Sequence, residues 1–364
     1  MVIEDGRLIV LSNETADNQT VGPGMELLEI NGHTVPELLR RFERVESSDG
    51  AIQTSKWVHI QRGFAMYYWF LVEQPESFSV KSKDAKGQLL EAKLAGLTRE
   101  QSGKSDNPVN APLRAGMKKI DWTHEDLAWR FIKQTDVAEL RIRSFNGDNF
   151  PGWVEATFKA LSEQRTKTLI IDLRGNGGGP DMHGALLVSY LVDKPFRYFD
   201  HITAKTIDPS FKAQADWSEE RTRELSRETT PRPTGGYQVK HAALAEQMPG
   251  KYPFHGKVIV LIDGGVFSTA ADFCAISHHL GRATFVGEET GGGYCGNNSG
   301  AFAHVTLPNS HFQIRLPLYG YWNAVAGNSR RGTLPNHQVL PKVESLLHGV
   351  DEPLEMALRL AASP

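Results

Sequence analysis

A serine at the start of a helix is the residue of this sequence best suited to do chemistry. Ser268 follows an apolar strand predicted over Lys257–Ile262 and a Gly264-Gly265 turn, and a predicted helix begins after it. Such a turn holds the hydroxyl clear of the sheet, beside the first free N–H groups of the helix, which can stabilise a developing negative charge. The pattern predicts a nucleophile. The alternative is that Ser268 only caps the helix. The apolar positions of this helix fall on one face: Phe273, Ile276 and Leu280.

A glycine-rich loop follows a second predicted strand, Thr168–Leu173. It reads Arg174-Gly175-Asn176-Gly177-Gly178-Gly179-Pro180 and precedes a predicted helix over Met182–Tyr190. Successive glycines permit positive φ and a close approach of backbone to a ligand, and N–H groups at a helix N-terminus bind anions. Neither a Gly-Lys-Ser/Thr ending nor a G-x-G-x-x-G spacing is present, which argues against phosphate binding. An oxyanion hole for a serine on a neighbouring strand fits better.

These segments resemble the C-terminal-processing (tail-specific) serine peptidases and the tricorn-core peptidases. The matching runs are IIDLRGNGGG, GGVFSTAADF, GRATFVGEETGGG and a closing segment in which Gly332, Pro335, Asn336 and Val339 fill a Gly-x-x-Pro-Asp-x-x-Val pattern, with Asn in place of Asp. The four runs occur in the family's order from about Val137 onward. The resemblance implies that Ser268 is the nucleophile, that the amide of Thr269 and an amide of Gly177 or Gly178 form the oxyanion hole, and that the core has a crotonase/ClpP-like α/β fold.

The resemblance also shows that the general base is missing from its expected place. In the processing branch a lysine of a Gly-x-x-Thr-x-Gly-Lys-Gly loop is the base, and Gly293 stands at that position here. The tricorn-like branch takes a histidine from a segment before a PDZ-like domain, and an acid from a position near Ser329 and Arg330. Met1 opens such a domain, so we expect a histidine-bearing segment upstream of it. We therefore expect the chain as given to hydrolyse peptides weakly or not at all.

Other side chains could supply the base or the acid in space. The candidate bases are His183, which follows the glycine loop, and His304, which with His311 flanks a predicted hairpin; His278 and His279 lie on the Ser268 helix. For any one of them a structural role is the simpler expectation. The candidate acids are Asp272, Glu288 and Glu289, for which solvated carboxylates are the simpler expectation.

Composition permits a soluble enzyme and excludes little. The 364 residues suggest two or three domains, and 40% hydrophobic with 23% charged residues is ordinary for a globular protein. A net charge of −3 gives no electrostatic case for nucleic acid, and no apolar run reaches the ~18 residues of a membrane span. Cys274 and Cys295 form neither a disulfide framework nor a metal site, and we expect no metal or cofactor. Without a signal peptide, we expect a cytoplasmic protein, or a periplasmic or extracellular one if an export signal has been removed.

The order of predicted elements divides the chain into three parts. Residues 1–100 resemble a PDZ-like module, with an Asn31-Gly32 turn, a helix from Val35 to about Arg44 and an aromatic core helix over Phe64–Phe70. Residues 101–130 read as a linker. Residues 131–364 alternate strand and helix, which predicts a mostly parallel sheet with ligands at the carboxyl ends of its strands. A polar insertion over about 208–250 shows no core pattern, which favours a solvated excursion over a flap on the cleft.

The sequence thus predicts a serine peptidase that cleaves peptide bonds through an acyl-enzyme. One alternative is a peptide-binding pseudoenzyme, or a truncated form, that keeps the cleft but lacks a base. A second alternative is a crotonase-like enzyme that binds acyl-CoA thioesters with the same strand-end amides and needs no Ser268. The partner expected for the first two is a peptide or protein, and the sequence indicates no oligomeric state.

Overall fold

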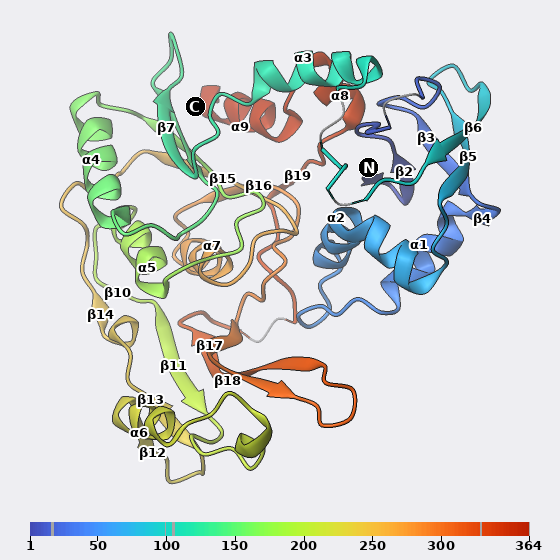
Figure 1. Ribbon diagram of the computed structural model, residues 1–364. Helices are drawn as coiled ribbons and strands as arrows, with labels where there is room; N and C mark the ends of the chain where they lie inside the picture. Colours follow the sequence, from blue (N-terminus) through green and yellow to red (C-terminus); the bar gives the residue numbers. More distant parts are fainter. Residues whose placement is uncertain (16–17, 99, 104–105, 328–329, 364) are drawn as a thin grey trace.

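In the residues that the computed structural model describes, the chain forms three large β-sheets and one two-stranded sheet (Figure 1). The structure describes residues 1–15, 18–98, 100–103, 106–327 and 330–363. Ser329, a residue near the expected acid, lies outside the described residues. Among the described residues, no helix is both long and apolar enough to cross a membrane.

The N-terminal module is an antiparallel sheet packed against two helices. Its strands are β1 (Val2–Glu4), β2 (Arg7–Ile9), β3 (Glu26–Ile30), β4 (His33–Thr34), β5 (Ser77–Lys83) and β6 (Leu89–Ala95), and its helices are α1 (Val35–Glu43) and α2 (Thr54–Leu71). The order is β1-β2-β3-β5-β6, with β4 beside β3. The expected aromatic core helix is half buried: Phe64 and Tyr68 face the sheet, whereas Trp69 and Phe70 are exposed.

The central sheet holds the predicted strands and is parallel except at one edge. Its order is β19 (His337–Gln338), β16 (Thr284–Gly287), β15 (Lys257–Ile262), β9 (Thr168–Asp172), β8 (Val137–Ile142) and the antiparallel β7 (Leu127–Phe131). One face packs against α4 (Phe150–Glu163), α5 (Asp181–Ser189) and α7 (Thr269–His279). The other face packs against α9 (Glu352–Ala362). The prediction of a mixed α/β fold with parallel strands is confirmed.

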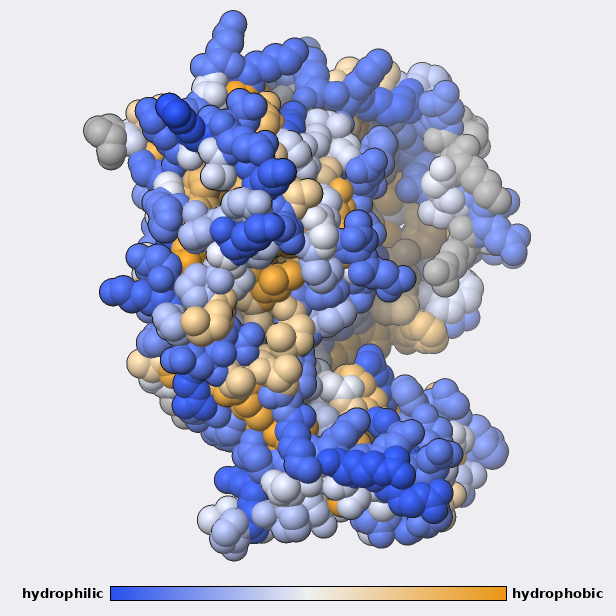
Figure 2. Space-filling view, turned by 90° about the vertical axis from the view of Figure 1, so that its left-hand side faces the viewer, coloured by the Kyte–Doolittle hydropathy of each residue, from blue (hydrophilic) through white to orange (hydrophobic). Residues whose placement is uncertain are grey.

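A third, antiparallel sheet extends from the central one at the bottom of Figure 1. Its order is β12 (Thr229–Pro231), β13 (Tyr237–Val239), β11 (Phe199–Ala204), β18 (Gln313–Asn323) and β17 (Gly296–Thr306), and α6 (Glu219–Glu228) covers it. The short strands β10 (Phe196–Arg197) and β14 (Glu246–Gln247) pair beside it. Figure 2 shows a mainly hydrophilic face that is hollowed between this lower part and the rest of the molecule.

Two expectations from the sequence were wrong. The segment 208–250 is not a solvated excursion, because β13 pairs with β11 and Leu225, Val239 and Ala243 are buried. The Ser268 helix does not present one apolar face, since every residue of α7 from Thr269 to Ser277 is buried. The expected linker or connecting segment contains the 3-10 turn η1 (Pro108–Asn110), the helix α3 (Ala111–Ile120), which packs on α8 (Val343–His348), and most of β7.

Candidate active site

Ser268 occupies a strained turn between β15 and α7. Its φ is 52° and its ψ is −134°, a region that residues with a Cβ rarely adopt. Backbone strain of this kind concentrates at functional sites. Although Ser268 stands at the N-cap position, its side chain makes no capping hydrogen bond with the helix residues, all of which the structure describes. The interpretation of Ser268 as a mere helix cap therefore loses its physical basis.

The glycine loop, Arg174–Pro180, packs directly on this serine. Gly178 has φ +105°, and a Cβ placed on it would lie 2.7 Å from the Cβ and 3.1 Å from the Oγ of Ser268. A Cβ on Gly179 would meet the backbone of Phe145 at 2.7 Å. Only glycine allows both the backbone conformation and the close approach at Gly178. The two segments that the sequence singled out thus meet at the carboxyl edge of the central sheet.

Buried polar side chains fix the glycine loop and the serine turn relative to each other. The fully buried Asn176 donates to the Ile142 carbonyl (2.8 Å), accepts from the Gly178 N–H (2.8 Å) and receives the Phe267 N–H on its own carbonyl (3.0 Å). Asp263 accepts the N–H groups of both Gly175 (2.8 Å) and Gly265 (2.9 Å). Because each residue joins both segments, the position of Ser268 relative to the glycine loop is fixed.

Two N–H groups near Ser268 remain available for a ligand. Within the described part of the chain, the N–H groups of Gly177 and Thr269 have no hydrogen-bond acceptor. The Gly178 N–H, in contrast, is occupied by Asn176. Of the two glycines predicted as oxyanion donors, Gly177 is therefore the one with a free donor. The Thr269 hydroxyl donates to the Gly179 carbonyl (2.5 Å), which ties the two segments together once more.

The candidate acids are not solvated carboxylates, as the sequence had suggested. Asp272 is 1% exposed, accepts from Asn297 (3.1 and 3.2 Å) and has its pKa raised to about 8, by burial first and by the neighbouring Asp181 second. Burial likewise raises the pKa of Glu288 to about 7. Glu289 is 6% exposed and binds the Arg331 guanidinium (2.6 and 2.8 Å) and the Gly332 N–H (2.8 Å).

The closing motif has a structural role at the sheet edge. Asn336 exchanges two hydrogen bonds with Phe285, from its own N–H (2.8 Å) and to its side-chain oxygen (2.7 Å). An amide oxygen accepts there as a carboxylate would, so Asn replaces Asp without loss of this contact. A Cβ on Gly332 would lie 2.3 Å from the Thr290 carbonyl. The motif thus docks β19 beside β16.

Each of the two histidines named as candidate bases has its Nδ1 engaged, and neither contacts Phe267, the neighbour of Ser268, among the ring contacts of the described residues. His183 Nδ1 bonds the Phe145 carbonyl (2.7 Å) and its ring stacks on Phe150 at 4.6 Å. His304 lies in β17 and pairs with Asp216 (2.7 Å). On the Ser268 helix itself, His278 bonds the Tyr294 hydroxyl (3.0 Å).

A segment of the N-terminal module, Asp49–Arg62, docks on the serine turn, and sequence reasoning missed it. The Ala51 N–H donates to the Arg330 carbonyl (2.7 Å), the Thr54 hydroxyl donates to the Glu289 carbonyl (2.9 Å), and the His59 ring stacks on Phe267 at 5.7 Å. We call residues 49–62 the docking segment. The available signal was weak: His59 and Arg62 are polar residues three apart in a largely apolar helix, which puts them on one face.

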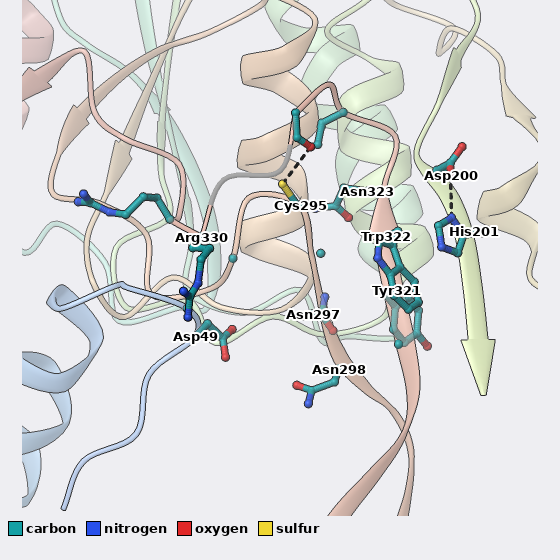
Figure 3. A pocket seen from close by; sticks show the side chains of 17 residues that line it. Asp49, Asp200, His201, Cys295, Asn297, Asn298, Tyr321, Trp322, Asn323 and Arg330 are labelled. Atoms are coloured by element: carbon teal, nitrogen blue, oxygen red, sulfur yellow. Dashed lines mark hydrogen bonds and ion pairs between the residues drawn. The ribbon is translucent and has the colours of Figure 1, made fainter. Parts of the chain in front are cut away.

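A cavity of ≈ 660 Å³ opens where the docking segment meets the core (Figure 3). Asp49 and Arg330 line one side, and Trp322 and His201, stacked at 4.4 Å, line the other. The Asp49 carboxylate lies near the Gly293 N–H, and burial raises its pKa. Gly293, at the position where the resemblance implied a lysine, forms part of the cavity wall. Among the described residues, no group of three or more His, Cys, Asp or Glu side chains is arranged to hold a metal ion.

Comparison with known proteins adds to this geometry. The model of peptidase family S41 matches residues 136–339. Mature CPAF complexed with lactacystin superposes with a TM-score of 0.65, at 16% identity over 99% of this chain and 81% of that chain. A second structure of mature CPAF superposes with a TM-score of 0.64, at 15% identity over 99% of this chain and 80% of that chain. For the photosystem II D1 C-terminal processing protease the TM-score is 0.39, at 14% identity over 96% of this chain and 74% of that chain. No curated protein sequence matches the chain.

The structural likenesses concern the fold, whereas the family model concerns the sequence itself. Its match covers more than half of the chain and includes both the glycine loop and the serine turn. The chain therefore belongs to peptidase family S41 and is a serine-type peptidase.

Proposed function

We propose that the chain hydrolyses peptide bonds through an acyl-enzyme on Ser268. The observation that carries the proposal is the strained turn at Ser268, whose hydroxyl caps nothing in its fully described helix and lies against Gly178. A hydroxyl that is held out of the helix and pressed on a glycine loop is presented for attack rather than used for stability.

The chemistry follows from the groups around this hydroxyl. Ser268 Oγ attacks the carbonyl carbon, and the N–H groups of Thr269 and Gly177 receive the oxyanion. Thr269 is the first residue of α7, so the partial positive charge of the helix N-terminus adds to the stabilisation. Collapse of the tetrahedral intermediate breaks the C–N bond, and water then hydrolyses the ester. Glycine at 293 excludes a lysine base at the place used by related enzymes.

We assign the cavity beside Gly293 to the substrate. It has a polar rim at Asp49 and Arg330 and an aromatic wall at Trp322, which suits an extended peptide with one side chain inserted. Cys295 and Asn297, which follow Gly293 in the sequence, also line the cavity. The Asn297 side chain donates a hydrogen bond to Asp272, which lies on α7, the helix that Ser268 precedes. One cavity-lining residue therefore contacts the helix of the candidate nucleophile.

We also propose that residues 1–100 form a PDZ-like module that captures peptide. Residues 131–364 would form the peptidase core, with a crotonase/ClpP-like fold. An apolar cavity of ≈ 210 Å³ between the sheet and α2 supports the first of these proposals. Its walls include Leu27, Phe64 and Val80. An edge strand beside an apolar groove is the usual means of binding an extended peptide.

A fluorophosphonate probe tests the nucleophile, because it labels only an activated serine. We expect labelling of Ser268 and its loss in Ser268→Ala, together with a fall in ester and peptide turnover of about 10⁴-fold or more. The Tm should hardly change, since the hydroxyl makes no capping bond. Ser277→Ala is the matched control, because Ser277 is buried on the same helix and its Oγ has no partner among the described residues.

The same experiment separates the peptide-binding pseudoenzyme. A wild-type protein that binds peptide but is not labelled would be such a pseudoenzyme. Turnover that survives Ser268→Ala would instead indicate chemistry that needs no nucleophilic serine, such as acyl-CoA chemistry at the strand-end amides.

A further inference from the structure

We propose that His59 is the general base of Ser268 and that Glu46 orients it. The inference rests on the proposed function, since it assigns the proton acceptor for the same nucleophile. It replaces the expectation that the base is absent from this chain with a specific residue of the N-terminal module.

The docking segment places His59 at the serine turn. The His59 ring lies parallel to the ring of Phe267, the residue next to Ser268, with 5.7 Å between centroids and 10° between planes. One turn further along α2, the Arg62 guanidinium packs against Gly175 and Gly265. A Cβ added to Gly175 would lie 3.2 Å from this guanidinium, and one added to Gly265 would lie 3.1 Å from it. At the start of α2, Thr54 packs on Gly264 and bonds the Glu289 carbonyl (2.9 Å).

One face of α2 therefore covers both segments that hold the Ser268 hydroxyl. Gly175 begins the glycine loop, and Gly264, Gly265 and Phe267 belong to the serine turn. His59 lies between Thr54 and Arg62 in this helix, and its side chain is 43% exposed.

The contacts of His59 suit a base. Its Nδ1 lies 3.0 Å from Glu46 Oε2, and the Glu46 carboxylate, 14% exposed, also accepts the Tyr67 hydroxyl. A carboxylate on Nδ1 fixes the tautomer with Nδ1–H donated to it, which leaves Nε2 as the acceptor. The carboxylate also stabilises the imidazolium that forms when Nε2 takes a proton. This carboxylate–histidine arrangement has the two roles of the base and its orienter.

The proton balance is complete with these residues. As the bond from Ser268 Oγ to the carbonyl carbon forms, Nε2 of His59 takes the hydroxyl proton. It gives that proton to the leaving nitrogen as the C–N bond breaks. A water then donates its proton to Nε2 while it attacks the ester, and the proton returns to Ser268.

The other histidines near the site make their ring contacts away from the serine turn. Within the described residues, no other histidine has a ring contact with Phe267. His183 is held by the Phe145 carbonyl, and the Nε2 of His241 faces Asp181 at 3.6 Å while its Nδ1 accepts from Ala243.

The test uses His59→Phe, which keeps an aromatic ring on Phe267 but removes the base. We expect ester turnover and the rate of fluorophosphonate labelling of Ser268 to fall by about 10²–10⁴-fold. Glu46→Gln should lower both rates by up to about 10⁴-fold, because an amide that donates to Nδ1 favours the tautomer with its proton on Nε2 and so removes the acceptor. Imidazole added to His59→Ala should restore part of the labelling rate, which a merely structural role would not allow.

The matched control is His33→Phe, another histidine of the module that faces a carboxylate, Glu37 at 3.8 Å. It should keep wild-type rates. Folded His59→Phe and His59→Gln proteins that turn over and label at the wild-type rate would overturn the inference. If Ser268→Ala still abolished labelling in that case, the proposed nucleophile would stand and the base would lie elsewhere. A wild-type protein without labelling would overturn both.

Discussion

The two sides of the candidate site are built in different ways. The serine turn and the glycine loop are buried, joined by Asn176 and Asp263, and made of two short runs of the sequence. The docking segment contacts them from the N-terminal module, and His59 in it is 43% exposed. Its contacts join residues more than 200 apart in the sequence, as from Thr54 to Glu289.

A substitution in the docking segment can therefore change the site without loss of the fold, whereas one at the serine turn disturbs the core. The serine turn and the glycine loop are held by many buried contacts, which maintain the strained backbone of Ser268. The docking segment is held by a few contacts, so a small change there can displace it. The following predictions measure each side separately.

The largest of these effects is expected at Gly178. Gly178→Val adds a side chain at φ +105°, where even its Cβ would lie 2.7 Å from the Cβ of Ser268, so the serine and the Gly177 amide must move. Misplacing one oxyanion donor costs about 10²–10³-fold in kcat. Gly177→Ala is the control, because its Cβ would meet nothing within 4 Å and its N–H is retained. Equal kcat values for the two folded variants would show that the loop only connects strand and helix.

A smaller effect is expected at the docking segment. Gly50→Ala places a Cβ 2.3 Å from the Arg330 carbonyl, which should displace the segment from the core and lower kcat/KM by about 10- to 100-fold. Gly32→Ala controls for backbone strain, because Gly32 also has positive φ but its Cβ would meet nothing within 4 Å. Steady-state kinetics on a peptide reporter gives the answer. If both variants lose activity equally, docking is not the cause.

The smallest effect concerns stability at Asp272. Its pKa is about 8 in the folded protein, whereas the pKa of an aspartate in an unfolded chain is about 3.9. Between these values the folded state binds more protons, so Asp272 lowers the free energy of unfolding increasingly as pH rises from about 4 to about 8. Asp272→Asn removes this dependence.

We therefore expect the Tm of Asp272→Asn to match that of the wild type near pH 4 and to exceed it by several degrees at pH 8. The asparagine can still accept from Asn297, and its amide can donate to Asn323 Oδ1, which lacks a partner among the described residues. Thermal melts across this range give the measurement. Asp106→Asn, which changes an exposed carboxylate, should show no such widening. A gap that stays constant with pH would contradict the raised pKa.

The sequence alone determined the strands of the central sheet and the two motifs at their ends. The predicted strands at 137–142 and 257–262 have the bounds of β8 and β15, because continuous apolar runs are typical of strands buried on both faces. Ser268 and the glycine loop could be found because turn geometry depends on adjacent residues. Ser268 and the glycine loop were expected to lie close together because the carboxyl ends of parallel strands lie at the same edge of a sheet.

Three features depend on long-range packing: the burial of the candidate carboxylates, the pairing of 208–250 as β12 and β13, and the contact of His59 with Phe267. Asp272 looked solvated because charge in a sequence does not reveal burial, which depends on Asn297 from a distant strand. The pairing of β13 with β11 depends on long-range register, which a polar surface pattern specifies weakly. The contact between α2 and the serine turn joins residues more than 200 apart, so no local pattern encodes it and only the packing of the two sheets brings it about.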